Sequence, residues 1–167
     1  MLKAKDGKIV FGTTNNGLII YDGKRFVNFT EKQGLVSNSI RSLMEDAAGN
    51  LWIGTADSGL SRFDGDSFDN IGATEGLIST AIKCSVQDYD GGIWFGTRGA
   101  GLVKYNGDKF RNITRSEGLS ESRVISIAQD RDKNLWLGTF GGYVTKIVAR
   151  DSSGTKVFEN LYYNDNS

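Results

Sequence analysis

The sequence almost lacks three residue types: its 167 residues include no histidine, no proline and one cysteine, Cys84. Without histidine, the chain cannot build a serine-histidine-aspartate or a cysteine-histidine nucleophile. A single cysteine cannot form an internal disulfide, and alone it is too little for a zinc site. These absences remove common catalytic and metal-binding chemistries, and we expect neither a cofactor nor a bound metal.

The chain also lacks net charge and long apolar runs. Its 20 Lys and Arg residues balance 20 Asp and Glu residues, so it carries no basic field of the kind that attracts nucleic acid. No apolar run approaches the roughly 18 residues of a membrane-spanning helix. The first residues, MLKAKDGKIVFG, are too polar for an export signal. We therefore expect a soluble segment that contacts neither nucleic acid nor membrane and has no export signal of its own.

Glycine, in contrast, is abundant, with 22 residues, and it recurs at a fixed interval. The phrases NLWIGT, GIWFGT and NLWLGT, with a weaker KIVFGT, share a Gly-Thr pair. These pairs begin at Gly12, Gly54, Gly96 and Gly138, so neighbouring copies lie 42 residues apart. A period between about 20 and 50 residues indicates a repeat array, in which one unit cannot bury its apolar face alone.

Each repeat contains four short apolar segments separated by turn signals. In the second repeat we expect strands at about 40–46, 51–55, 60–64 and 67–71, with the Asp-Gly pair before the last strand forming a hairpin turn. The fourth repeat has about six extra residues, in VARDSSGTK, within one hairpin turn. Helical periodicity is not visible. Four strands at this period are typical of a β-propeller blade whose first strand is innermost.

The sequence therefore predicts an all-β fold, a β-propeller segment built from four 42-residue, four-stranded blades over residues 1–167. The expected blades cover about residues 1–37, 38–79, 80–121 and 122–167. The first blade is incomplete, because residues 1–5 match only the last part of an inner strand. An open array of this kind leaves an apolar blade face at each end, and such faces favour association.

The recurring tryptophan and glycine have a packing explanation. Blades pack face to face, so both faces of an inner strand are buried, which accounts for nearly continuous apolar runs. Trp52 and Gly54 point to the same face by the two-residue alternation of a strand. The glycine then leaves room for a close approach, either by a neighbouring blade or by the indole ring. We interpret the motif as packing between blades.

Other recurring residues also favour structural roles. An aspartate stands at the same turn in three repeats, at Asp46, Asp88 and Asp130, which favours turn capping. The phrase DYDGG resembles the start of a calcium loop, but Gly99 stands where the twelfth-position glutamate is required. Cys84 lies in an expected inner strand, where a small buried core residue is favoured over a reactive thiol.

The phrase D-x-x-G-N-L-W-I-G-T-x-x-x-G-L-x-R-F-D-G, followed by phenylalanine and then E-G-L, resembles the two-component regulator propeller repeat. The Gly-His and Trp-Asp signatures of the WD40 repeat are absent. The resemblance covers almost the whole chain, and the second and third repeats match fully. Two departures occur, Val10 at the tryptophan position of the first repeat and Tyr143 at a glycine position of the fourth.

The resemblance implies a function that composition alone does not. This repeat is found in the extracytoplasmic sensor regions of large bacterial hybrid histidine kinases. It implies a non-enzymatic sensor in the periplasm or outside the cell, which binds a ligand, often a carbohydrate breakdown product, and passes the signal to a kinase. Propellers of the family usually have about seven blades, so the chain resembles a segment of a longer array.

Candidate binding residues lie where the repeats differ while their scaffold stays the same. Loops before the first strand and turns between the second and third strands should meet at one end of every blade, where propellers commonly bind ligands. An aromatic ring with cationic and amide groups suits an anionic saccharide. The candidate residues are Asn15, Asn16, Arg41, Asp57, Lys83, Arg98, Arg123 and Phe140.

Three functions are compatible with these features. The first is a ligand-sensing propeller segment, possible ligands being small molecules or saccharides. The second is a scaffold for protein–protein interaction, which the same surface can serve. The third is a propeller lyase or glycosidase that uses carboxylates and tyrosines. For partners, we expect either a second copy, giving a homodimer with an eight-bladed ring, or the remaining blades of a longer chain.

Overall fold

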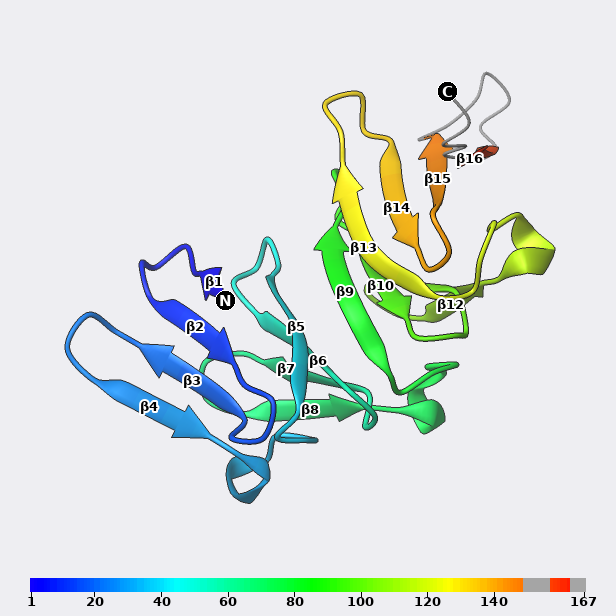
Figure 1. Ribbon diagram of the computed structural model, residues 1–167. Helices are drawn as coiled ribbons and strands as arrows, with labels where there is room; N and C mark the ends of the chain where they lie inside the picture. The colour runs from blue at the N-terminus through cyan, green and yellow to red at the C-terminus, as the bar shows by residue number, and fades with distance from the viewer. Residues whose placement is uncertain (149–156, 163–167) are drawn as a thin grey trace.

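The computed structural model describes residues 1–148 and 157–162, which form four antiparallel sheets of four strands each (Figure 1). The first two sheets contain β1 (Leu2–Lys3), β2 (Ile9–Gly12), β3 (Leu18–Tyr21), β4 (Phe26–Phe29), β5 (Ile40–Glu45), β6 (Leu51–Thr55), β7 (Leu60–Phe63) and β8 (Phe68–Ile71). The last two contain β9 (Ile82–Gln87), β10 (Ile93–Thr97), β11 (Leu102–Tyr105), β12 (Phe110–Ile113), β13 (Val124–Gln129), β14 (Leu135–Thr139), β15 (Tyr143–Val148) and β16 (Val157–Tyr162). We number these sheets blades 1 to 4 in chain order.

Within each blade, every strand pairs with its neighbours in the chain, so the order is simply that of the sequence. The blades stand side by side in an open arc, with blades 1 and 4 at its two ends (Figure 1). The inner strands β5, β9 and β13 pack against one another in turn. The all-β propeller architecture predicted from the repeats is confirmed, and the four strands expected in the second repeat agree with β5–β8 to within one residue at each end.

Two predicted details fall at the ends of the chain. The inner strand of blade 1, β1, has two residues, whereas β5, β9 and β13 have six each, so the first inner strand is indeed short. The extra residues expected in the hairpin turn before β16 fall at 149–156, outside the described part of the chain. No helix in the described residues is long and apolar enough to cross a membrane.

The Glu-Gly-Leu phrase builds the loop between blades, which the strand pattern did not predict. In blade 3, residues Arg115–Glu117 form one turn of 3-10 helix, and the Glu117 carboxylate accepts the Thr114 backbone N–H at 2.8 Å. Gly118 ends the turn with a φ of 111°, which favours glycine. Leu119 then enters the core between blades 3 and 4. The equivalent turns are Glu31–Gln33 and Ala73–Glu75.

Both faces of the second strand are buried, as the apolar runs predicted. Trp52 is 2% exposed, and its ring packs against Phe95 and Tyr105 of blade 3 at centroid distances of 5.6 and 5.3 Å. On the opposite side of β6, Leu51 and Ile53 join a core shared with blade 1. Each seam between neighbouring blades is therefore a continuous apolar core.

The glycine of the motif makes room for the next blade rather than for the indole. A methyl group added at Gly54 would lie 2.6 Å from Ile82, the first residue of β9. At Gly96 it would lie 2.8 Å from Val124, the first residue of β13. Real side chains do not approach this closely, so any larger residue would push the neighbouring inner strand away. Of the two explanations considered for the glycine, the neighbouring blade is correct.

Candidate functional site

Hydrogen bonds gather two sets of loops at one end of the blades, which we call the loop face. In blades 2 to 4, the turn after the second strand bonds to the segment before its own first strand, as in Arg98 N to Ala81 O at 3.0 Å and Phe140 N to Arg123 O at 2.9 Å. A second bond reaches the next blade, for example Gly101 N to Ser122 O at 2.7 Å. The blades are thus joined along this end, where the sequence placed the candidate residues.

The threonine of the Gly-Thr pair organises each turn of the loop face. The Thr55 hydroxyl donates to Gly59 O at 2.8 Å and accepts the Ser58 backbone N–H at 3.1 Å. Gly59 has a φ of 93°, so the turn requires glycine at this point. Thr97 and Gly101 repeat the arrangement in blade 3. The conformation of these turns is therefore held by the scaffold, while the residues between the threonine and the glycine remain free to differ.

Three of the eight candidate residues come together at the seam of blades 3 and 4. The Arg123 guanidinium lies over the Phe140 ring, 4.3 Å from its centroid, and its Nε donates to Arg98 O at 3.3 Å. Phe140 is 59% exposed, Arg98 is exposed, and Arg123 is half-buried. Within the described residues, the terminal nitrogens of Arg123 donate no recorded hydrogen bond. We call Arg98, Arg123 and Phe140 the arginine cluster.

The other five candidates lie on the loop face or near it but outside the arginine cluster. Asp57 accepts the Ser58 hydroxyl at 2.9 Å, Lys83 is half-buried, and the remaining three side chains are exposed. Among the described residues, no recorded hydrogen bond, ion pair or ring contact connects any of them with the cluster. These five residues are Asn15, Asn16, Arg41, Asp57 and Lys83.

A recurring aspartate–tryptophan contact lies at the opposite end of the blades. In blade 2, Asp46 caps its turn by accepting the Asn50 backbone N–H at 2.9 Å, as predicted. Its other oxygen accepts the Trp52 indole N–H at 2.9 Å. Burial opposes charge on Asp46, but the hydrogen bonds from Asn50 and Trp52 outweigh it, so the pKa of Asp46 lies below its usual value. The aspartate therefore anchors the indole as well as the turn.

Sequence reasoning found the aspartates but missed this second role. Trp94 donates to Asp88 at 2.7 Å, and Trp136 donates to Asp130 at 2.7 Å. The pKa of Asp130 is lowered chiefly by the hydrogen bond from Trp136. For Asp88, burial opposes ionisation, but the Trp94 bond and the charge of Lys104 still leave its pKa below the usual value. The missed signal was the constant six-residue spacing from aspartate to tryptophan.

The single thiol, Cys84, is poorly suited to nucleophilic chemistry. Burial raises the pKa of the Cys84 thiol to about 12, so it stays protonated at neutral pH and is a poor nucleophile. Cys84 faces Gly96 across the inner strand pair, in the position that Ser42 and Ser126 hold in blades 2 and 4. No group of three or more metal-ligating side chains occurs within residues 1–148 and 157–162.

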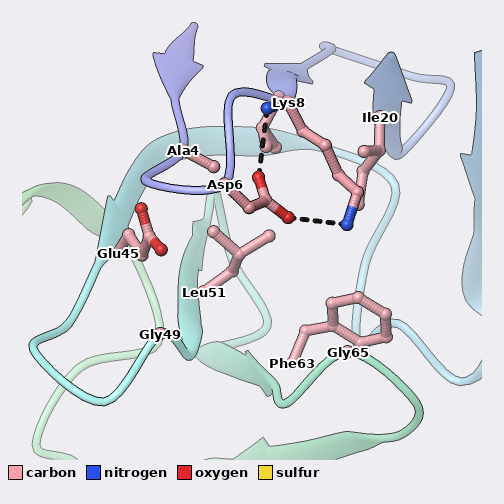
Figure 2. A pocket seen from close by; sticks show the side chains of 10 residues that line it. Ala4, Asp6, Lys8, Ile20, Glu45, Gly49, Leu51, Phe63 and Gly65 are labelled. Carbon is pink, nitrogen blue, oxygen red and sulfur yellow. Dashed lines mark hydrogen bonds and ion pairs between the residues drawn. The ribbon is translucent and has the colours of Figure 1, made fainter. Parts of the chain in front are cut away.

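Recesses on the surface lie away from the arginine cluster. One of about 420 Å³ lies at the rim of blades 2 and 3, with Trp52, Arg62 and Tyr105 among its lining residues. Another, of about 80 Å³, lies between blades 1 and 2 at the end opposite the loop face (Figure 2). A ligand of the arginine cluster would therefore rest on an exposed face rather than enter a closed cavity.

Comparison with known families identifies the repeats. The family described as two component regulator propeller matches residues 34–57, 76–99 and 118–141, each segment running from the loop between blades to the turn after the second strand. The chain carries repeats of the two component regulator propeller family, as the resemblance in sequence implied. No curated protein sequence matches the chain.

Solved structures with the same fold include extracellular domains and an enzyme. Two are extracellular domains assigned to hybrid two component systems of B. thetaiotaomicron, with TM-scores of 0.82 and 0.81 and identities of 24% and 20%. They match 96% and 99% of this chain, which spans only 22% and 24% of their own lengths. Virginiamycin B lyase from Staphylococcus aureus has a TM-score of 0.78 at 13% identity, over 99% of this chain and 55% of the lyase.

Proposed function

We propose that this chain is a non-enzymatic, ligand-binding segment of an extracytoplasmic sensor propeller, and that the arginine cluster on the loop face holds an anionic ligand. The carrying observation is the placement of Arg123. Its guanidinium is oriented by the Phe140 ring and by the Arg98 carbonyl, while its terminal nitrogens keep their donors available. A planar guanidinium with two parallel N–H groups matches a carboxylate.

The ligand class follows from the cluster and from the family. The Arg123 guanidinium favours a negative group, and the exposed Phe140 ring adds an apolar surface of the kind on which a sugar ring can rest. An anionic saccharide, such as an oligosaccharide with a uronic acid, combines both features. Repeats of the two component regulator propeller family and the extracellular origin of the similar propellers support a sensor that meets such ligands outside the cytoplasm.

The lyase alternative has less support than binding. A histidine-to-alanine variant of virginiamycin B lyase is catalytically inactive, and this chain contains no histidine to take such a role. A scaffold for another protein remains the alternative that uses the same surface. Binding of a saccharide would distinguish the sensor from a protein scaffold, and the absence of a released product would distinguish it from a lyase.

The experiment is a titration of the chain with acidic oligosaccharides and their neutral counterparts, followed by calorimetry and thermal shift. We expect saturable binding of an acidic member, and a loss on the order of tenfold in affinity for Arg123→Ala. Arg111→Ala is the matched control, because Arg111 is an exposed arginine on β12 outside the cluster. Equal weakening by both variants, or no binding by any acidic saccharide, would reject the proposal.

A further inference from the structure

The seam of blades 1 and 2 differs from the other seams at two positions. Counting back 42 residues, Ala4 stands at the position of Asp46, and Val10 at that of Trp52. Val10 is 1% exposed and joins the core shared with blade 2, so it faces the seam as the tryptophans do. Blade 1 therefore has neither the indole ring nor the carboxylate that anchors it.

A cavity of about 80 Å³ lies at this seam (Figure 2). A recess between blades 3 and 4 occupies the equivalent place two repeats later: six of its lining residues are the ones found by adding 84 to the numbers of residues that line the cavity of blades 1 and 2. This equivalent recess measures only about 10 Å³. At that seam Trp94 is fully buried and bonded to Asp88, one of the lining residues. The larger cavity therefore goes with the small Val10 in blade 1, and the smaller recess goes with a buried tryptophan, Trp94, in blade 3.

The walls of the cavity retain the surfaces against which a ring packs. Trp52 packs against Tyr105 in the next seam at 5.3 Å, and Phe63 holds the position of Tyr105 in blade 2. Leu51 and Phe63 lie below the Asp6–Lys8 pair in Figure 2, and Ile20 lies above them, beside the Lys8 side chain. An aromatic molecule placed here would meet one aromatic ring and several aliphatic side chains, as the built-in indole does.

The rim of the cavity supplies hydrogen-bond acceptors. Glu45 accepts the Lys5 backbone N–H at 2.7 Å, and Asp6 accepts the Lys8 ammonium at 2.6 Å across the mouth (Figure 2). A carboxylate can accept further bonds through its remaining lone pairs. A ligand with an N–H or O–H group could therefore donate to this rim as Trp52 donates to Asp46 in the next blade.

We propose that this cavity is a binding site for a small planar aromatic molecule that carries an N–H or O–H donor, such as indole. An engineered apolar cavity of about 150 Å³ binds benzene, so a two-ring molecule requires the Asp6–Lys8 turn to move outward. The Asp6–Lys8 ion pair of that turn is solvent-exposed, and such pairs contribute little. The turn is also held by backbone hydrogen bonds from Ala4 N to Lys8 O at 2.8 Å and from Gly7 N to Ala4 O at 3.0 Å, so the ligand must move this hydrogen-bonded turn as a unit or break these bonds. The site lies at the end opposite the loop face and does not depend on the arginine cluster.

The first test is a titration of the intact chain with indole, followed by methyl NMR. We expect saturable shifts confined to methyl groups that line the cavity, such as those of Val10, Ile20 and Leu51, with a Kd of about 1 mM or lower. 1-Methylindole, which has no N–H donor, should bind about fivefold more weakly. Shifts centred on Val103 in the seam of blades 2 and 3, or no saturation up to about 5 mM, would overturn the proposal.

The second test fills the cavity from within. The double variant Ala4→Asp, Val10→Trp restores the pair found in the other blades, so it should raise the melting temperature by about 5 °C and abolish the indole-induced shifts. A folded double variant that binds indole with unchanged affinity would show that indole binds elsewhere. If the double variant does not fold, the localisation of the methyl shifts in the parent chain still decides the question.

Discussion

The same motif meets two different surroundings in blades 2 and 4. In blade 2, Trp52 is covered by Phe95 and Tyr105 of the next blade. In blade 4, Trp136 is half-buried, and Lys146 of its own blade lies over the ring at 5.6 Å. The hydrogen bond from indole to aspartate is nevertheless present in both blades. The motif therefore sets the local anchor by itself, while the apolar packing depends on a neighbouring blade.

The largest expected effect of the difference between inner and end blades concerns the association of two chains. The outer faces of blades 1 and 4 carry half-buried apolar side chains, such as Phe11 and Trp136, on the sides that face a neighbour in the inner blades. We propose that two copies pair end to end through these faces in an eight-bladed ring. Light scattering after size exclusion should then give a mass near twice the 18.2 kDa of one chain.

The control for assembly is Trp136→Glu, which places a charge on the outer face of blade 4 and should yield the single chain. A parent chain that elutes as one species near 18.2 kDa at all concentrations would contradict the homodimer. In that case the neighbours of these faces would have to be sought in other polypeptide segments, such as further blades.

Truncation of the tryptophans should separate the inner seam from the end face. Trp52→Ala removes a fully packed ring and should lower the free energy of unfolding by about 3–5 kcal/mol. Trp136→Ala, measured at concentrations where only the single chain is present, should cost about 1 kcal/mol because its side chain is already partly exposed to water. Chemical denaturation measures both. Equal losses would mean that the neighbouring blade contributes little to the burial energy.

Replacing the motif glycine by alanine should also distinguish blade 2, which has a neighbour at this position, from blade 4, which has none among the described residues. Gly54→Ala forces the new group against Ile82 of blade 3 and should cost about 1–3 kcal/mol. At Gly138, the side chain that the new group would meet within the described residues is that of the exposed Ser126, which can turn away. Gly138→Ala should therefore change the free energy of unfolding by less than about 0.5 kcal/mol. A neutral Gly54→Ala variant would contradict the close approach of blades.

The smallest expected effect concerns acid stability, where the two blades should behave alike. Hydrogen bonds keep the pKa of Asp46 and of Asp130 below the unfolded value of about 3.9. Their stabilisation is complete above that value and is lost as the pH falls through the lower folded pKa. The melting temperature should therefore fall less steeply below about pH 4 in Asp46→Asn and in Asp130→Asn than in the parent.

Asp57→Asn is the matched control for acid stability, because Asp57 is exposed and, among residues 1–148 and 157–162, its carboxylate accepts a hydrogen bond from the neighbouring Ser58 hydroxyl alone. Its melting temperature should follow the parent through the acid range. If Asp46→Asn flattened the acid response and Asp130→Asn did not, the aspartate–tryptophan contact would depend on the neighbouring blade rather than on the motif alone.

Much of the fold was predictable because its determinants are local. The alternation of Leu51, Trp52 and Ile53 defines a strand buried on both faces, and the Asp-Gly pairs place the hairpin turns. The candidate site was only partly predictable. Sequence variation pointed to eight residues, but it did not show which of them touch. The contact of Arg123 with Phe140 lies within blade 4 and depends on how the turn after β14 folds back onto the segment before β13. The bond from Arg123 to the Arg98 carbonyl depends on how blades 3 and 4 meet, which no single repeat contains.

The sequence by itself determined the number of strands, their order and the side of each strand that carries the tryptophan. These follow from a 42-residue period and from backbone preferences that act over a few neighbouring residues. The tertiary structure alone decided that the first seam has a cavity and that Arg98 of blade 3 meets Arg123 of blade 4. Val10 is small in any context, but it leaves a space only because Leu51 and Phe63 are held at a distance set by the packing of the whole seam.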